Sequence, residues 1–325
     1  MYNLGVNLSS LNYQVFKTKK RYEIIENFIK ICEQEKISGI EFYPSSFYKN
    51  FHKISNNKNI SNDLAKINNK GLFYILDCDK VFNLEAIKKL IKLIKNSKKK
   101  IIVLTLTKIL ECNRHLIKKD WKELIEDSIK FLKKLEPIAR DNNVKIAIEN
   151  HQDLDSNDFL KLLDKFKTDT IGINFDIGNA YAVCEDPMTF CKKIVHKINS
   201  IHLKDYKIYE TKKGFMLSNC TIGEGEVKFK KIIDFVNNHK NVTKMIEPGQ
   251  LIGRHIKKNN KIFWKKIGSR AADERKIFDM EMSYILKKNK NMIFKSPLEL
   301  KKKDEEIFSF LNKQLLDSIK FCKLI

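Results

Sequence analysis

The sequence predicts an α/β protein, a (β/α)8 TIM barrel with a C-terminal helical extension. The chain has 325 residues, which is enough for one barrel of about 250 residues and an extension. Eight short apolar runs alternate with segments of helical periodicity. Four successive runs end on residues that can ligate a metal ion, and a barrel would gather these at the carboxyl ends of its strands. An open, doubly wound sheet is the alternative, but it gives no reason for ligands on four adjacent strand ends.

The expected strands are short and rich in β-branched residues, as buried parallel strands are. They cover residues 2–8, 38–43, 72–77, 101–107, 144–149, 171–175, 198–203 and 243–247. Apolar residues at helical spacing predict the helices between them. These helices cover residues 21–34, 83–95, 120–140, 158–166, 187–195 and 229–238.

Two further helical patterns follow the last strand, over residues 271–286 and 298–321. We expect the first to be the helix that closes the barrel. The second has apolar residues on one face, which we expect to pack against the barrel bottom or a partner subunit. The predicted organisation is a barrel of residues 1–290 and a helical extension of residues 291–325.

The net charge of +23 would ordinarily indicate a nucleic-acid or anionic partner. Only six of the 63 basic residues are arginines, however, and arginine is the better phosphate ligand. We therefore expect no nucleic-acid partner.

The seven cysteines include no C-x-x-C pair and predict reduced, mostly buried thiols in a cytoplasmic protein. Neither a basic leader nor a long apolar run is present, so no membrane segment is expected.

The stretch VKIAIENH, residues 144–151, runs from an apolar strand directly into Glu149. The next three apolar runs lead to Asp176, His202 and Glu247. A single carboxylate after a strand is most often a helix cap or a loop ion pair. Four in succession instead predict one metal site. Three carboxylates and one imidazole form a mainly hard donor set, which favours Mn²⁺, with Mg²⁺ or Co²⁺ as alternatives.

Glu149 and Glu247 follow the fifth and eighth strands, so they would approach such an ion from different sides. This arrangement suits two general acid/base groups on opposite faces of a carbon next to a carbonyl. His202 should offer one ring nitrogen to the metal and the other to an acceptor. Glu41, inside the second strand, is a candidate to point into the barrel mouth.

Five further residues are candidate substrate ligands because they lie near the expected strand ends. They are His151, Asn179, Lys204, Arg254 and His255. Lys204 follows His202 by two residues and therefore points to the same side, where it would bind substrate or pair with Glu247 or Asp205. A surface salt bridge is the alternative for Arg254, and a hydrogen-bonded loop position is the alternative for His151.

The series IENH, FDIGN, IHLKD, GEGEV and IEPG resembles the xylose isomerase-like sugar phosphate isomerase/epimerase superfamily, over roughly residues 1–290. The resemblance implies a divalent metal held by Glu149, Asp176, His202 and Glu247. In the ketose 3-epimerase branch the two glutamates are the acid/base pair.

The chain departs from that branch at two positions. It has Asn179 three residues after the metal aspartate and Ile208 six residues after the metal histidine, where those epimerases carry a histidine and an arginine. The segment EPGQLIGRHI, with Trp264 behind it, instead resembles less-characterised members with an extended carboxyl region. Relatives of that kind include enzymes that decarboxylate a 3-oxo sugar acid.

The leading hypothesis is a metal-dependent isomerase or epimerase that acts on a keto-sugar or oxo-sugar acid through a metal-stabilised enediolate. The second is a lyase, a decarboxylase or dehydratase acting on a 3-oxo sugar acid. An endonuclease IV-like DNA repair enzyme ranks lower, because it needs a three-zinc cluster with several histidines and the chain has seven in all. A non-catalytic binding module is the remaining option. The expected partners are a small sugar or sugar-acid substrate and a second copy of the chain in a homo-oligomer.

Overall fold

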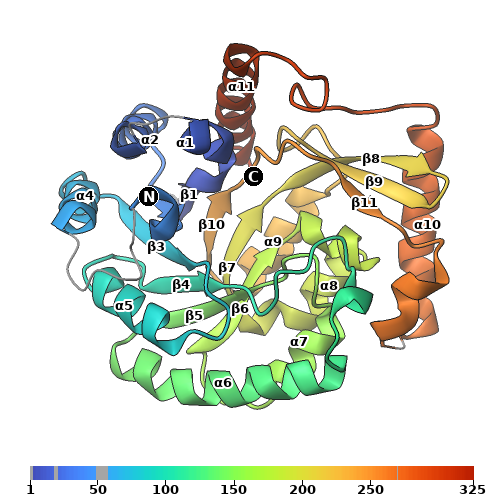
Figure 1. Ribbon diagram of the computed structural model, residues 1–325, viewed down its shortest axis with the longest axis horizontal. Helices are drawn as coiled ribbons and strands as arrows, with labels where there is room; N and C mark the ends of the chain where they lie inside the picture. Colours follow the sequence, from blue (N-terminus) through green and yellow to red (C-terminus); the bar gives the residue numbers. More distant parts are fainter. Residues whose placement is uncertain (1–2, 18–20, 49–57, 269) are drawn as a thin grey trace.

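The computed structural model describes residues 3–17, 21–48, 58–268 and 270–325, and its centre is a closed barrel of eight parallel strands (Figure 1). The strand order around the barrel is β1-β10-β7-β6-β5-β4-β3-β2. These strands are β1 (Leu4–Asn7), β2 (Gly39–Phe42), β3 (Phe73–Cys78), β4 (Ile101–Leu104), β5 (Lys145–Glu149), β6 (Ile171–Asp176), β7 (Ile198–Leu203) and β10 (Thr243–Ile246). All eight expected strands are confirmed to within three residues at either end, although Tyr2 lies outside the described residues.

Helices cover the outside of the barrel, and the six expected between strands are confirmed. They are α2 (Arg21–Glu35), α5 (Leu84–Ile94), α6 (Trp121–Asp141), α7 (Ser156–Leu163), α8 (Pro187–Ile194) and α9 (Phe229–His239). The sequence did not predict α1 (Asn12–Lys17), α3 (Pro44–Phe47) and α4 (Lys58–Asn69). In α4 the frequent asparagines have low helix propensity. Its buried Ile60, Leu64 and Ile67 lie on one face at helical spacing, so packing stabilises this helix.

The barrel interior is packed with side chains, because alternate residues of each strand point inward. Inward-facing residues from β3, β4, β5 and β10 form a separate buried cluster of Phe73, Ile75, Ile101, Val103, Ala147 and Met245. Their neighbours along the strands, such as Tyr74 and Ile102, belong to the larger core between the strands and the helices. The interior is therefore filled, and chemistry is confined to the rim.

A second, antiparallel sheet beside the barrel was not predicted. Its order is β11-β9-β8, with β8 (Asp205–Thr211), β9 (Gly214–Cys220) and β11 (Arg254–Ile256). The signal was present in the sequence, because Tyr206 and Ile208 alternate with polar residues before a short turn, and Phe215 and Leu217 alternate after it. β8 begins two residues after the end of β7, so this sheet continues the strand that carries His202.

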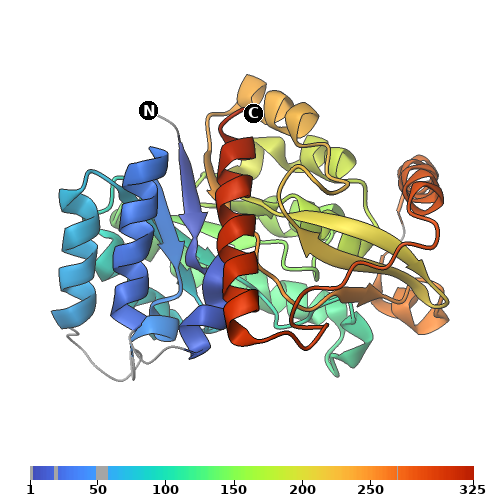
Figure 2. The same ribbon diagram turned by 90° about the horizontal axis from the view of Figure 1, so that it is seen from above.

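The expectation that the helix near residues 271–286 closes the barrel is wrong. This helix, α10 (Ala272–Lys288), packs on β8 of the second sheet. The closing position belongs to α11 (Asp304–Cys322), which packs on β10 and on the 3₁₀ helix Leu8–Leu11. Figure 2 shows α11 upright between the N-terminal helices and the second sheet. The boundary expected at residue 290 stays a prediction, but α11 shares the core of the barrel.

We expect Leu315→Ala to lower the free energy of unfolding by about 2–5 kcal/mol, because the side chain is buried where α11 meets the barrel. Chemical denaturation monitored by circular dichroism measures the change. The control is Leu324→Ala, at a residue that is 83% exposed, where we expect a change below about 0.5 kcal/mol. Equal stabilities of the two variants would mean that α11 is a loosely attached extension.

All seven cysteines are buried free thiols, as expected. Within the described ranges, no helix has the length and the apolar character that crossing a membrane requires.

Candidate active site

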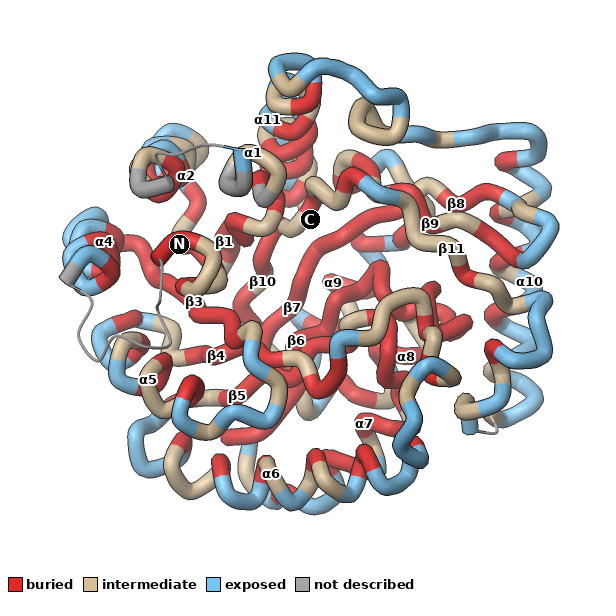
Figure 3. The backbone as a smooth tube through the Cα atoms, viewed as in Figure 1, coloured by how far each residue is buried: buried red, intermediate tan, exposed pale blue. Residues whose placement is uncertain are grey.

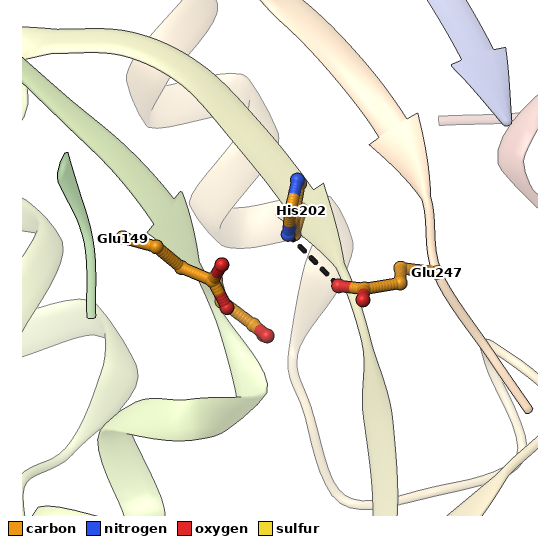
Figure 4. Close-up of side chains that lie close together, drawn as sticks. Glu149, His202 and Glu247 are labelled. Carbon is orange, nitrogen blue, oxygen red and sulfur yellow. Dashed lines mark ion pairs between the residues drawn. The ribbon is translucent and has the colours of Figure 1, made fainter. Parts of the chain in front are cut away.

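Four adjacent strands bring the four candidate ligands to one rim of the barrel. Glu149 ends β5, Asp176 ends β6, His202 is the next-to-last residue of β7, and Glu247 follows β10 directly. The register places Asp176 opposite His202 on the neighbouring strand. One donor atom from each of the four residues lies within 4.8 Å of the other three. Figure 4 shows Glu149 and Glu247 on either side of His202.

The His202 imidazole is held between two carboxylates. Its Nε2 lies 2.7 Å from Oε1 of Glu41, and its Nδ1 lies 2.8 Å from Oε2 of Glu247. Burial alone would lower the pKa of this histidine, but Glu41 and Glu247 outweigh it and raise the pKa well above its ordinary value. The sequence analysis expected an acceptor for the second ring nitrogen of His202 but did not identify it. In the structure this acceptor is Glu41. It holds the ring from the Nε2 side, so that Nδ1 faces Glu247.

Lys204 lies among the carboxylates. Its Nζ is 2.7 Å from Oδ2 of Asp176 and 2.9 Å from Oε2 of Glu247. Burial opposes the ammonium form, but Asp176 and Glu247 outweigh it and raise the pKa of Lys204 well above its ordinary value. Asn179 donates from Nδ2 to the same Oδ2 of Asp176 at 2.7 Å. The lysine and the asparagine thus satisfy one oxygen of Asp176 and leave the other oxygen free.

The remaining donor atoms fit a hard divalent cation. Oδ1 of Asp176, Nδ1 of His202 and Oε2 of Glu247 are buried and make no hydrogen bond of acceptable geometry. Buried polar atoms normally make well-formed hydrogen bonds. Oδ1 of Asp176 has no partner at all, and Nδ1 of His202 and Oε2 of Glu247 form an ion pair of poor hydrogen-bond geometry, so a cation between them would satisfy all three atoms.

The two glutamates have different proton affinities. Burial is the largest influence on Glu149 and, with the nearby Glu247 charge, it raises the pKa to about 7 although His202 opposes the shift. For Glu247, burial is outweighed by Lys204 and His202, and the pKa falls well below its ordinary value. At neutral pH, therefore, Glu149 can hold or release a proton while Glu247 stays ionised.

A close approach of the chain fixes Glu247 from its other side. Gly249 has a positive φ of 103°, and a Cβ there would meet the Ser10 carbonyl oxygen at 2.1 Å. Only glycine allows the segment after β10 to pass this near the 3₁₀ helix Leu8–Leu11. In this arrangement Ser9 donates from Oγ to Oε1 of Glu247 at 2.7 Å.

The candidate substrate ligands divide into those near the metal-site residues and one that is not. The ring of His151 is largely buried, its Nδ1 has no partner, and burial lowers its pKa, so it is neutral. Strand pairing places Arg254 on the same face of the second sheet as Tyr206. The hydroxyl of Tyr206 donates to Oδ1 of Asn179 at 2.9 Å. Nε of Arg254 is buried and unpaired.

His255 is the candidate that the structure does not bring to the site. It lies on the opposite face of the second sheet from Arg254, because successive residues of a strand alternate. Its Nε2 is 2.8 Å from Oγ1 of Thr211, at the far end of the hairpin. The expectation of a substrate contact at His255 is therefore corrected, and its position next to Arg254 in the chain was misleading.

Sequence reasoning missed three residues that complete the site. Ser9 holds Glu247, Tyr206 holds Asn179, and Gln152 donates to Oδ1 of Asn179 at 3.2 Å. Tyr206 follows Lys204 by two residues, and this spacing could have found it. No local pattern marks Ser9, because it reaches Glu247 only when the barrel closes.

Replacing Glu41 by glutamine should weaken metal binding by about 10- to 100-fold, because the charge that orients His202 is lost. Isothermal titration with Mn²⁺ measures the affinity. Glu185→Gln is the matched control, because Glu185 is also a buried glutamate but its carboxylate accepts hydrogen bonds from Ser156 and contacts none of the candidate ligands. Equal effects in the two variants would show that Glu41 has no special role in orienting the ring.

Comparisons with known proteins agree with this geometry. A family model described as "Xylose isomerase-like TIM barrel" matches residues 76–250. The chain belongs to the xylose isomerase-like TIM barrel family. The match includes all four candidate ligands of the metal site.

Two curated relatives align with part of the chain, and their names are those of a decarboxylase and a dehydratase. A 3-oxo-isoapionate decarboxylase of Pectobacterium atrosepticum is 22% identical over 125 residues, which cover 38% of this chain and 46% of the relative. An inosose dehydratase of Clostridium tetani is 25% identical over 150 residues, which cover 41% of this chain and 49% of the relative. The chain thus matches about half the length of each.

A solved structure of a xylose isomerase-like TIM barrel protein from Mycobacterium smegmatis, in complex with magnesium, has a similar fold. The TM-score is 0.60 at 14% identity, covering 87% of this chain and 97% of that one. The family contains enzymes, and the names of the two curated relatives state different reactions, a decarboxylation and a dehydration.

Proposed function

We propose that the protein is a divalent-metal-dependent enzyme that moves a proton next to the carbonyl of a keto-sugar or oxo-sugar acid, as an isomerase or epimerase. The observation that carries this proposal is the placement of Glu149 and Glu247 on either side of His202 at one rim of the barrel. A reversible proton transfer needs one group that accepts a proton while another is ready to donate, and this pair meets that need.

The proposed metal ligands are Glu149, Asp176, His202 and Glu247. When bound, the ion would polarise the substrate carbonyl and lower the cost of removing a neighbouring proton by several kcal/mol. We propose Mn²⁺ as the preferred ion because the donor set is mainly oxygen with one nitrogen, with Mg²⁺ or Co²⁺ as alternatives. We keep the cytoplasmic location as a prediction, because buried free thiols suit a reducing compartment.

The chain's own residues would then divide the work. Glu149 and Glu247 exchange protons with the substrate carbon from opposite sides. Lys204, whose ammonium group already contacts two of the ligand carboxylates, would donate hydrogen bonds to a substrate oxygen. His151 is neutral and unpaired on Nδ1, so it would bind a substrate hydroxyl. Asn179 acts through Asp176 and Tyr206, and we propose that its contact with substrate is secondary.

A lyase acting on a 3-oxo sugar acid is the second candidate, and three observations favour it. Arg254 has an unpaired buried Nε on the face that carries Tyr206, and an arginine fork suits a substrate carboxylate. Ile208, at the position where ketose epimerases carry an arginine, is buried in the second sheet and offers no polar group. The two partial relatives named above are a decarboxylase and a dehydratase.

One experiment separates the two candidates. The Mn²⁺-loaded protein is incubated in D₂O with a panel of keto-sugars and oxo-sugar acids, and the products are followed by NMR and mass spectrometry. An isomerase or epimerase incorporates deuterium next to the carbonyl and leaves the carbon skeleton whole. A lyase releases CO₂ or water. Ligand binding that survives metal removal, with no exchange or turnover on any substrate, would overturn both in favour of a binding module.

Cleavage of abasic DNA is not part of the proposal. Among the residues that the structure describes, one cluster of at least three metal-competent side chains is found, and it contains a single histidine. A three-zinc site needs several histidines. Tight, salt-sensitive cleavage of abasic DNA by the purified protein would reverse this judgement.

A further inference from the structure

The helix α10 is apolar on two opposite faces. Its inner face carries Phe278, Met282 and Ile285, which are buried, and the Phe278 ring lies 6.4 Å from the Phe215 ring of the second sheet. Its outer face is exposed at the edge of the molecule (Figure 3). That face carries Ile277, Met280 and Tyr284, with exposed fractions of 46%, 64% and 70%. A helix with apolar residues on both faces normally has both faces covered.

The outer stripe ends in opposite charges. Asp273, Ile277, Met280, Tyr284 and Lys287 follow one another at intervals of four, three, four and three residues, so they form a single line along the helix. Within the described part of the chain, neither Asp273 nor Lys287 takes part in any of the ion pairs found.

Three other charged residues of α10, which lie off this line, are paired within the subunit. Glu274 lies 2.6 Å from Lys193, Lys288 lies 3.0 Å from Glu226, and Asp279 lies 3.5 Å from Lys258. The stripe differs from these positions in its apolar centre and in the opposite, unpaired charges at its two ends.

We propose that a second copy of this chain docks on this stripe, with the two α10 helices antiparallel about a two-fold axis at Met280. Asp273 and Lys287 are each seven residues from Met280, or about 10 Å at the helical rise. In the antiparallel pair each Asp273 therefore faces Lys287 of the partner subunit, at both ends. Ile277 and Tyr284 lie about 5 Å to either side of Met280 along the helix. Ile277 of each copy therefore faces Tyr284 of the partner subunit.

The charge pattern of the α10 stripe identifies a second copy of the chain as the binding partner. A two-fold interface places the same patch against itself, so a patch with an acid at one end and a base at the other matches only an inverted copy. An anionic membrane surface would select a uniformly basic rim, which Asp273 contradicts. A single helix pair is smaller than a standard interface of about 1,600 Å², so we expect a dissociation constant on the order of micromolar. The inference does not depend on the proposed function.

Sedimentation velocity of the full-length protein from about 1 to 100 μM tests the association. We expect a monomer–dimer equilibrium. Met280→Glu places two carboxylates together on the axis and should leave a monomer, while Leu324→Glu, at an exposed position away from α10, should leave the dimer intact. Asp273→Lys and Lys287→Asp should each weaken the dimer about tenfold or more, and the double variant should restore it. Circular dichroism confirms that each variant is folded.

Oxidative cross-linking locates the axis independently of affinity. All seven native cysteines are buried, so Met280→Cys adds the one exposed thiol of the described chain. It should form a disulfide-linked dimer under mild oxidation, whereas Leu324→Cys should not. A wild-type monomer at every concentration would overturn the proposal. So would a dimer that Met280→Glu leaves unchanged, because the copies would then meet elsewhere.

Discussion

Replacing Glu149 by glutamine is expected to lower kcat by about 10²- to 10⁴-fold, the usual contribution of a general acid or base. Glutamine keeps the size of the side chain but cannot exchange a proton at the substrate carbon. Glu149 is buried at the end of β5, on the opposite side of His202 from Glu247, which is where one member of the acid/base pair is needed. Steady-state kinetics with the substrate found in the D₂O screen measures the effect.

Because Glu149 is also a proposed ligand, the variant must be compared at full metal loading. Metal content by mass spectrometry separates loss of the ion from loss of proton transfer, and deuterium exchange into the substrate reports proton transfer alone. Glu123→Gln, at an exposed position of α6, is the control and should keep wild-type kinetics. A metal-loaded Glu149→Gln enzyme with wild-type exchange would remove Glu149 from the acid/base pair.

Deprotonation of two buried carboxyls is by itself expected to raise metal affinity about 10³-fold between pH 5 and pH 8. In the metal-free protein the pKa of Glu149 is raised to about 7 and that of Asp176 to about 6, in both cases chiefly by burial. At pH 5 both carboxyls therefore carry protons that the ion must displace, which costs roughly 10²-fold for the first and 10-fold for the second. At pH 8 both are ionised, so this cost disappears.

His202 adds to the same trend, because its pKa is raised well above its ordinary value and its Nδ1 must be free of a proton to bind metal. Titration calorimetry at pH 7, in buffers of different ionisation enthalpy, should therefore detect release of about one to two protons per ion. An affinity that stays constant with pH, without proton release, would mean that the ion binds outside this buried cluster.

Much of the barrel could be predicted because each strand has a recognisable pattern in its own short stretch of sequence. The run ending in Glu149 and the three that follow each combine β-branched residues with an abrupt polar end, and parallel strands must deliver such ends to one rim. Spacing alone also placed Lys204 on the side of His202. These predictions depend on the spacing of apolar residues and on the order of the strands along the chain, both of which a single sequence shows directly.

The parts that could not be predicted depend on contacts between distant segments. Glu41 lies 161 positions from His202 in the chain, and Ser9 lies 238 from Glu247, so closure of the barrel alone brings these pairs together. The role of α11 was mistaken for a related reason. Helical periodicity shows that one face of a helix will be buried, but not which strand will cover it. In the structure α10 packs on β8 of the second sheet, so α11 packs on the barrel instead.

Crystals of the Mn²⁺-loaded protein, measured at the manganese absorption edge, would test the convergence of the four strand ends most directly. We expect one anomalous peak about 2.0–2.4 Å from a donor atom of each of Glu149, Asp176, His202 and Glu247. A peak at another place, or a fully loaded protein in which any two of these side chains lie out of reach of the ion, would contradict the proposed metal site and the enzyme built on it.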